Sequence, residues 1–347
     1  LPARVEGLGG ERAVPPSTRR AMSPTSSAAV IAKTALSLAV LLVLTPFALL
    51  ASFVVDYCTR RAHPALKRTA LLVAYFRAEL ASAGLRGDRK TAKILATLPW
   101  VPRAAAWLTA AYADLPIWRY LYPLYARLTS LVPHANHAGR DLLRTRTLFI
   151  DEVVAASPAR QLVILGAGFD TRCHLPQFSQ DRTCFEVDLA ATQAAKREAL
   201  SASRVGNPKV TYVPVDFNKE CWLDRLVEQG FDLASPAVVV WEGVSYYLEP
   251  AAVDATAQLV AKLAPGSEVV LDFFTRAVVA GDDFPRLGKV LKGMGEPLLF
   301  GVDYDGDEGI EAWARKSGLQ LQARVPVGRQ GRAPGGGVPP LRKPPSG

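Results

Sequence analysis

The sequence has 347 residues, of which 49% are hydrophobic, so it can bury a substantial core and is not an intrinsically disordered chain. Its formal charge is +9, but the two ends, residues 1–33 and 329–347, carry an excess of seven of these nine charges. A basic groove on the folded part is therefore not expected, and nucleic acid is not an expected partner.

Residues 1–33 are rich in Pro, Gly, Ser and Arg, and we expect them to be disordered. They are followed by 22 uncharged residues, 34–55, with the sequence TALSLAVLLVLTPFALLASFVV. About 20 residues rising ~1.5 Å each cross a ~30 Å bilayer core, so this length is sufficient for a transmembrane helix over 34–56. Pro46 is compatible with such a helix, because membrane helices tolerate proline.

The residues beside this segment indicate its orientation. Arg60, Arg61, Lys67 and Arg68 follow it, and this cluster favours a membrane-anchored protein whose downstream domain faces the cytosol. A cleaved signal peptide is disfavoured, because its apolar region is usually only about 7 to 15 residues long. The remaining alternative is a cytoplasmic protein in which the segment is a buried or partner-covered helix.

Residues 57–150 have a helical pattern and are predicted to form a helical cap region. The stretch PALKRTALLVAYFRAELASAG places apolar residues three to four apart and ends at Gly84, as in an amphipathic helix with a glycine stop. The aromatic segment 100–125 is interrupted by prolines and predicts short helices. A further helix is expected over 140–156.

Residues 151–328 alternate between β-branched runs and helical segments, which predicts an α/β domain with a doubly wound, mostly parallel sheet. Residues 329–347 are rich in Pro and Gly and are expected to be a disordered tail. Strands are predicted at 161–165, 183–187, 210–214, 237–241 and 268–274, and helices near 189–202, 219–229, 250–263 and 308–317.

The first strand runs into a glycine turn, VILGAGFDTR. A dinucleotide site would have the pattern G-x-G-x-x-G, but Thr171 stands where the third glycine would be. Asp170, close to the expected helix start, would also repel a phosphate. Gly166 and Gly168 therefore suit a ligand that has a ribose but no phosphate, and S-adenosylmethionine has this chemistry.

Carboxylates follow the next two strands. Asp188 ends the second strand about 20 residues after the turn, where a carboxylate can accept the hydroxyls of a ribose. Glu186 lies on the same strand face and could share or replace that role. Asp216 follows the third strand and is positioned for an adenine amino group, with Phe217 beside it as an apolar wall.

A metal site is not indicated. The four cysteines include no C-x-x-C pair, and the four histidines lack the H-E-x-x-H spacing. His134 and His137 are three residues apart, but their surroundings, VPHANHAG, resemble a loop. We expect the cysteines to be reduced thiols.

Several motifs occur in a familiar order: RTLFIDEVV, QLVILGAGFDTR, FEVD, VPVDFN and VVWEGVSYYLEP. Together they resemble the leucine carboxyl methyltransferase family, and more closely its bacterial-type branch of S-adenosylmethionine-dependent O-methyltransferases. The resemblance covers about residues 65–325. It implies a class I methyltransferase, Rossmann-like fold with an N-terminal helical cap, and S-adenosylmethionine as the cofactor.

The resemblance also implies roles for individual residues. Arg146 would pair with the cofactor carboxylate, and Glu242 would lie beside the methionyl part. Gly166 and Gly168 would form the turn, and Asp188 would bind the ribose. The same resemblance assigns the adenine to Asp216 and Phe217.

Simple chemistry agrees with two of these roles. The planar fork of an arginine matches a carboxylate bidentately, whereas Arg140 and Arg144 are expected to be solvated charges. Glu242 follows a strongly apolar strand, where an unpaired carboxylate would be costly. Tyr246 and Tyr247 come next and could position an acceptor oxygen, although packing in the core explains them equally well.

The expected function is transfer of a methyl group to a carboxylate or hydroxyl of a small molecule or a protein. One alternative is a non-catalytic, membrane-anchored protein that retains the fold; a weaker one is a nicotinamide-dependent oxidoreductase, disfavoured by the missing third glycine. The chain departs from the family at residues 34–55 and after Val327, where a final antiparallel strand pair would normally complete the sheet.

Overall fold

The computed structural model describes residues 68–82, 84–98, 137–304, 306, 309–322 and 341–342. All of them belong to one compact unit of the chain, residues 48–347. The apolar segment 34–56 predicted to cross a membrane lies outside these residues, as do the predicted disordered segment 1–33 and most of the predicted tail. Across the described ranges, no helix has both the length and the apolarity that a membrane span requires.

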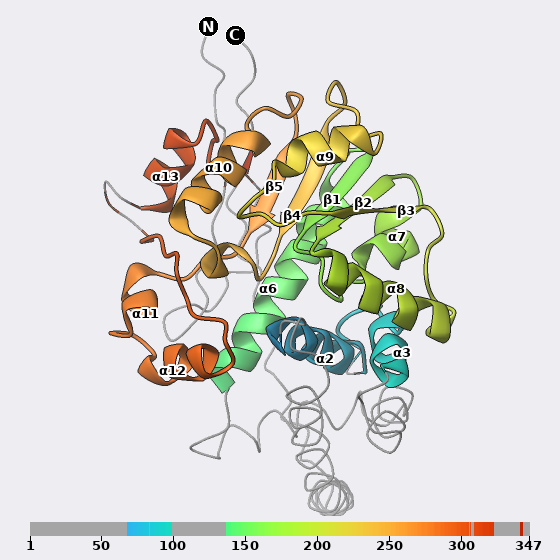
Figure 1. Cartoon of the computed structure of the whole chain (residues 1–347), viewed down its shortest axis with the longest axis horizontal. Helices are drawn as coiled ribbons and strands as arrows, with labels where there is room; N and C mark the ends of the chain where they lie inside the picture. Colours follow the sequence, from blue (N-terminus) through green and yellow to red (C-terminus); the bar gives the residue numbers. More distant parts are fainter. Residues whose placement is uncertain are drawn as a thin grey trace, which may run out of the picture. The chain divides into compact units, whose positions relative to one another are not determined.

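The described strands form one sheet in the order β3-β2-β1-β4-β5-β6 (Figure 1). The first five strands are parallel, and β6 pairs antiparallel with β5. The chain moves outward from β1 to β3 and then returns to the other side of β1, so the topological switch point lies between β1 and β4. The strands are β1 Gln161–Leu165, β2 Thr183–Asp188, β3 Val210–Pro214, β4 Ala237–Trp241, β5 Glu268–Leu271 and β6 Leu341–Arg342.

The central strands are buried on both faces. Every residue of β1 (QLVIL) and of β4 (AVVVW) is buried, as expected for a sheet covered by helices on both sides. Three strands, at 161–165, 210–214 and 237–241, have the predicted bounds. The fifth is shorter than predicted, because the carboxylate and carbonyl of Asp272 bond to the loop after β4 instead of extending the ladder.

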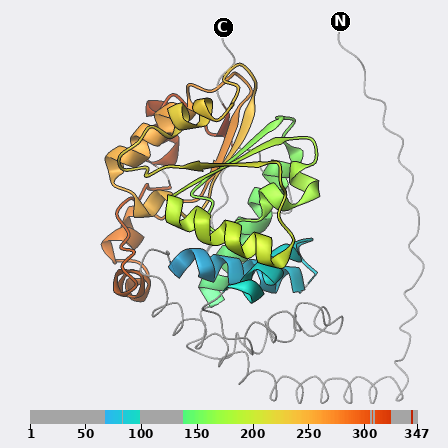
Figure 2. The same cartoon turned by 45° about the vertical axis from the view of Figure 1, so that its right-hand side comes forward.

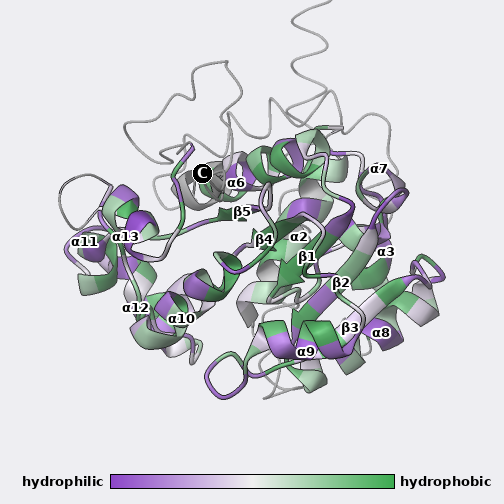
Figure 3. Ribbon diagram, turned by 90° about the horizontal axis from the view of Figure 1, so that it is seen from above, coloured by the Kyte–Doolittle hydropathy of each residue, from purple (hydrophilic) through white to green (hydrophobic). Residues whose placement is uncertain are grey.

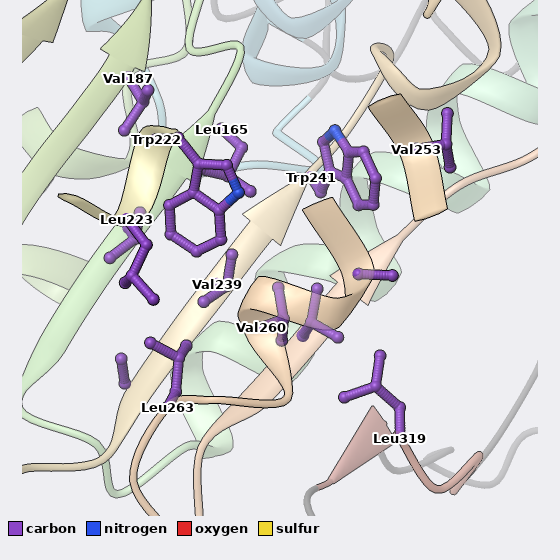
Figure 4. Packing of buried hydrophobic residues seen from close by; sticks show 14 of the residues in the cluster. Leu165, Val187, Trp222, Leu223, Val239, Trp241, Val253, Val260, Leu263 and Leu319 are labelled. Atoms are coloured by element: carbon purple, nitrogen blue, oxygen red, sulfur yellow. The ribbon is translucent and has the colours of Figure 1, made fainter. Parts of the chain in front are cut away.

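Helices cover both faces of the sheet. On one face, Ile150 and Val153 of α6 pack against Leu162 and Ile164 of β1. On the other face, the core contains residues of α9, α10 and α13 together with Val239 and Trp241 of β4, several of which are seen in Figure 4. Figure 3 shows the strands largely in the hydrophobic colour, whereas the helices also carry hydrophilic residues. The helices are α2 Arg68–Ser82, α3 Lys90–Thr97, α6 His137–Ala156, η1 Arg172–His174, α7 Pro176–Ser179, α8 Ala190–Ser203, α9 Trp222–Glu228, η2 Ser245–Tyr247, α10 Pro250–Val260, α11 Arg276–Ala280, α12 Pro285–Gly293 and α13 Ile310–Lys316.

The described part of the predicted cap consists of α2, α3 and α6. Helix α3 packs on α8, and α2 packs on both α3 and α6 (Figure 2). Leu71 and Ala74 of α2 are buried in a cluster that includes Leu200 of α8. These contacts bring α2 beside the loop that follows β1, although Ser82 at the end of α2 precedes Gly166 by more than 80 residues in sequence.

Within the predicted tail, the structure describes only β6. Leu341 pairs with Val269, and Arg342 pairs with Glu268. This antiparallel strand lies next to β5 at the edge of the sheet. The sequence after Val327 showed no evident strand pair for this position. The other boundaries of the predicted domains stay predictions.

Candidate functional site at the carboxyl edge of the sheet

The glycine turn after β1 requires glycine at its first position. Gly166 has a φ of +68°, and a Cβ atom there would lie 2.2 Å from Cγ2 of Val244. This turn therefore packs directly against the loop after β4, with no room for a side chain. Gly168, with a φ of +43°, faces Ala70 of α2, whose Cβ atom would be 3.2 Å from an added Cβ.

Asp188 fastens the turn to the end of β2. Its Oδ2 accepts a hydrogen bond from Gly168 N at 2.6 Å, and its Oδ1 accepts one from Leu189 N at 2.7 Å. Burial raises the pKa of this carboxyl above its ordinary value, although the two backbone N–H groups oppose that rise. Each oxygen keeps a second lone pair, so Asp188 can also accept a hydroxyl.

Asp170 does not stand at the start of a long helix. The turn leads into the short helix η1, and the Asp170 carboxylate is buried between Arg172 Nη1 at 2.6 Å and Arg77 Nη2 at 3.0 Å. Burial opposes ionisation of Asp170, but the two guanidinium groups outweigh it and hold its pKa well below the ordinary range.

Glu242, just after β4, forms ion pairs with three arginines. Its Oε2 lies 2.6 Å from Arg77 Nη2 and 2.7 Å from Arg172 Nη1, and its Oε1 lies 2.9 Å from Arg146 Nε. Desolvation acts against the charge, yet the three guanidinium groups dominate and hold the pKa of Glu242 well below its ordinary value. The carboxylate predicted to need a partner therefore has three.

Arg146 lies on the face of α6 that packs against the sheet, whereas Arg144 is exposed. Its Nη1 donates to Asp272 Oδ2 at 2.6 Å and to the hydroxyl of Tyr246 at 3.1 Å. Among the described residues, its buried Nη2 has no hydrogen-bond partner. A buried, unpartnered guanidinium N–H is costly, so this nitrogen is a candidate donor to a ligand.

The ion pairs continue beyond the predicted residues. Arg172 Nε contacts Asp151 at 2.7 Å, and Asp151 also contacts Arg86 at 2.7 Å. Arg86 in turn pairs with Asp88 at 2.6 Å. We call the following set the arginine network: Arg77, Arg86, Arg146, Arg172, Asp88, Asp151, Asp170, Glu242 and Asp272.

Most of this network was not predicted from the sequence. Arg172 belongs to the motif GAGFDTR, and Asp272 is an acid near a strand end like Asp188, so the sequence could have indicated both as site residues. Arg77 had no such indication, because a charged residue on an amphipathic helix is usually solvated.

Glu186 is placed elsewhere. Its fully buried carboxylate lies 2.6 Å from Lys196 Nζ of α8 and 3.2 Å from His174 Nε2. His174 Nδ1 accepts a hydrogen bond from Asn207 N. This group contributes to the packing of α8 against the sheet.

Asp216 and Phe217 follow β3, as predicted. The Asp216 carboxylate accepts a hydrogen bond from Asn218 N at 3.1 Å and pairs with Lys219 at 2.9 Å. The hydrogen bond from Lys219 lowers the pKa of Asp216. Phe217 is partly buried against the core. No described contact joins these two residues to the arginine network.

The two tyrosines lie in η2. Tyr246 is buried, and its hydroxyl donates to Asp272 Oδ2 at 3.2 Å. Burial, followed by the nearby Asp272 carboxylate, raises its pKa well above the ordinary value, so its phenol stays protonated. Tyr247 is half-buried with its ring centroid 4.6 Å from that of Tyr246, and burial with Glu296 nearby raises its pKa too.

A family model described as leucine carboxyl methyltransferase matches residues 123–261. A candidate S-adenosyl-L-methionine-dependent methyltransferase of Mycolicibacterium smegmatis is 30% identical over 225 residues, which cover 58% of this chain and 71% of that protein. A protein of the same description from Mycobacteroides abscessus is 33% identical over 175 residues, covering 46% of this chain and 55% of its own length. The chain thus spans about half the length of some curated relatives that it matches.

Among solved structures, a duf574 family protein from Streptomyces avermitilis has a TM-score of 0.44 at 16% identity, covering 73% of this chain and 97% of that one. An O-methyltransferase family protein from Burkholderia thailandensis has a TM-score of 0.39 at 19% identity, covering 62% of this chain and 59% of that one.

Proposed function

Because the chain belongs to the leucine carboxyl methyltransferase family, we propose that it is an S-adenosylmethionine-dependent methyltransferase acting on an oxygen of its acceptor. The acceptor oxygen would belong to a carboxylate or a hydroxyl of a small molecule or a protein. The single observation that supports this most strongly is the Nη2 of Arg146, which is buried without a hydrogen-bond partner among the described residues, at the carboxyl edge beside the switch point.

The residues at this edge fit the two ends of S-adenosylmethionine. Arg146 offers its free nitrogen to the carboxylate of the amino-acid end, next to Glu242. Gly166 and Gly168 leave these two positions of the turn without side chains. Asp188 has lone pairs left for ribose hydroxyls. Asp216 and Phe217 are proposed to contact the adenine.

The charge of the arginine network also suits this cofactor. Five carboxylates face four guanidinium groups, so the network carries one net negative charge when all of them are ionised. S-adenosylmethionine carries one net positive charge, from a sulfonium and an ammonium against a carboxylate. Burial at low dielectric makes this complementarity stronger than it would be in water.

When bound, S-adenosylmethionine supplies an electrophilic methyl group on a sulfonium. The protein's part is orientation: Arg146, Asp188 and Glu242 hold the two ends so that an acceptor oxygen can approach in line with the bond from sulfur to methyl. Such alignment contributes on the order of 7 to 11 kcal/mol. A carboxylate acceptor is already ionised at neutral pH, so no general base is needed, and the protonated Tyr246 and Tyr247 serve at most to position that oxygen.

The test is calorimetric titration with S-adenosylhomocysteine, the product that keeps the amino-acid end, on the full chain and on the variants Arg146→Met and Arg146→Lys. We expect binding to the wild type and at least tenfold weaker binding to both variants, because neither can hold a donor at the position of Nη2 while bonding Glu242 and Asp272. Circular dichroism checks that the variants are folded. A wild-type protein that binds only a nicotinamide dinucleotide, or neither ligand, would contradict the proposal.

Transfer itself is tested with methyl-labelled S-adenosylmethionine and a cell extract. Label that mild base releases indicates a carboxyl ester, and base-stable label indicates an ether from a hydroxyl. Binding without any transfer would instead favour the non-catalytic alternative.

We also propose that residues 34–55 anchor the protein in a membrane with the catalytic domain in the cytosol. The 22 uncharged residues and the basic cluster after them support this. The full chain should stay in the membrane fraction after alkaline carbonate washing, and a variant without residues 1–56 should not. Full release of the intact chain would leave the cytoplasmic alternative.

A further inference from the structure

Asp272 is the first residue after β5, and its carboxylate lies between three donors. Its Oδ1 accepts from Gly243 N at 2.6 Å. Its Oδ2 accepts from Arg146 Nη1 at 2.6 Å and from the Tyr246 hydroxyl at 3.2 Å. The Asp272 side chain is only 16% exposed, so these contacts are largely shielded from water.

These contacts determine the orientation of Arg146. Glu242 holds Nε at 2.9 Å, and Asp272 holds Nη1 at 2.6 Å. A guanidinium group is planar, so fixing two of its nitrogens also fixes the plane and the direction of the third. Without Asp272, Nη1 would keep only the Tyr246 hydroxyl as a partner, and the guanidinium group would lose the charged contact that fixes its plane.

The same carboxylate holds the backbone next to Nη2. Gly243 has a φ of +74°, and a Cβ atom there would lie 3.7 Å from Arg146 Nη2. Glycine thus keeps the flank of this nitrogen open, and the bond from Gly243 N to Asp272 holds the loop in that conformation.

We propose that Asp272 is a positioning residue: by binding Arg146 Nη1 and Gly243 N together, it presents Arg146 Nη2 to the carboxylate of the cofactor. This inference rests on the proposed function. Asp272 acts through Arg146 and touches only the amino-acid end of the site, so its removal should weaken ligands that carry an amino acid and spare those that do not.

The test compares two probes on the variant Asp272→Asn. S-adenosylhomocysteine carries the amino-acid end, and 5′-methylthioadenosine lacks it. We expect the affinity for S-adenosylhomocysteine to fall about 10- to 100-fold, the usual effect of losing a hydrogen bond to a charged group. The affinity for 5′-methylthioadenosine should change less than about twofold, because its adenosine contacts stay intact.

Two controls separate this role from a structural one. Asp282→Asn makes the same chemical change at an exposed residue outside the arginine network and should leave both affinities unchanged. In an Arg146→Met background, Asp272→Asn should cause no further loss of S-adenosylhomocysteine binding, since Asp272 then has no guanidinium to orient. If Asp272→Asn does not fold, Asp272→Glu keeps the charge but displaces the oxygens, and the same selective loss is expected.

The outcomes are distinguishable. Equal weakening of both probes by the Asp272 variant, or a further loss in the Arg146→Met background, would overturn the positioning role and leave the proposed function standing. A wild-type chain that binds neither probe would instead overturn the proposed function.

Discussion

At the scale of single residues, Asp188 shows how one carboxylate combines structure with binding. It fastens the glycine turn through Gly168 N and is proposed to accept the ribose hydroxyls. Burial raises its pKa above the ordinary value of 3.8, against the opposing effect of the two backbone N–H groups. A raised pKa means that the buried charge costs the folded state free energy, so protonation of Asp188 favours folding.

Protonation of Asp188, which favours folding, should weaken ligand binding. The affinity for S-adenosylhomocysteine should fall as the pH is lowered through the raised pKa of Asp188, because a protonated carboxyl loses acceptor capacity for the ribose. Calorimetric titration at a series of pH values from neutral downward measures this fall. The variant Asp188→Asn should bind weakly and show a flatter profile; an equally steep profile in that variant would assign the titration to another group.

Glu186 illustrates a limit of strand periodicity. It shares a strand face with Asp188, as the period of two requires, but it lies two residues deeper, or roughly 6.6 Å at about 3.3 Å per residue. That depth places it under α8, where it pairs with Lys196 and lies beside His174. The period of two shows which face of the strand a side chain is on. Whether that side chain can reach a ligand or is buried in the core depends on the helix that covers the face.

At the scale of elements, α2 connects the cap to the site. Its Ala70 lies against Gly168, and its Arg77 pairs with Asp170 after β1 and with Glu242 after β4. Thr69, the residue before Ala70, donates to the buried Glu296. An amphipathic pattern predicted the helix, but not that Arg77 on it would be buried, because that depends on which loops lie opposite.

Replacing Arg77 should loosen α2 selectively. Arg77→Met removes one guanidinium from Asp170 and Glu242, and breaking a buried pair typically costs about 3 to 5 kcal/mol. We expect lower stability to denaturant and faster hydrogen exchange of the α2 amides than of the β1 and β4 amides. The exposed Arg89→Met is the matched control and should change neither quantity. Uniform acceleration throughout the sheet would argue against a local role of Arg77.

At the scale of the whole molecule, the arginine network joins α2, α6 and the loops that follow β1, β4 and β5. Folding removes these charged side chains from water at a cost in free energy, so the network stabilises the fold only while its charges stay paired. The pKa values of Asp170 and Glu242 are lowered, so their contribution is present above the ordinary carboxyl values of 3.8 and 4.5. It is lost as the pH falls through the lowered values.

The variant Glu242→Gln should therefore be destabilised in a pH-dependent way. At neutral pH we expect a loss of about 3 kcal/mol, since three guanidinium groups lose their shared carboxylate. The difference from the wild type should shrink as the pH falls below 4.5, because the carboxyl of Glu242 then binds a proton in the unfolded state while the folded state resists protonation down to its lowered pKa. Urea unfolding at several pH values measures it, and a pH-independent difference would contradict this account.

Much of the fold could be predicted from the sequence. The runs LVIL and AVVVW are apolar at every position, which is typical of parallel strands covered on both faces, so the bounds of β1 and β4 followed. Helices α11 and α12 were not predicted, since they are short. The roles of Gly166, Gly168, Asp188 and Arg146 were accessible because motif order and residue chemistry pointed to the same edge of the sheet.

The sequence by itself determined the class of the fold, the glycine turn and the acid at the end of β2, because these depend on residues close together in the chain. Only the tertiary structure decided that Arg77, Arg146 and Arg172 converge on Glu242, and that Asp272 leaves one nitrogen of Arg146 free. Ion pairs between residues 70 to 170 positions apart have no local periodicity. They arise when packing removes the charges from water and each must find a partner.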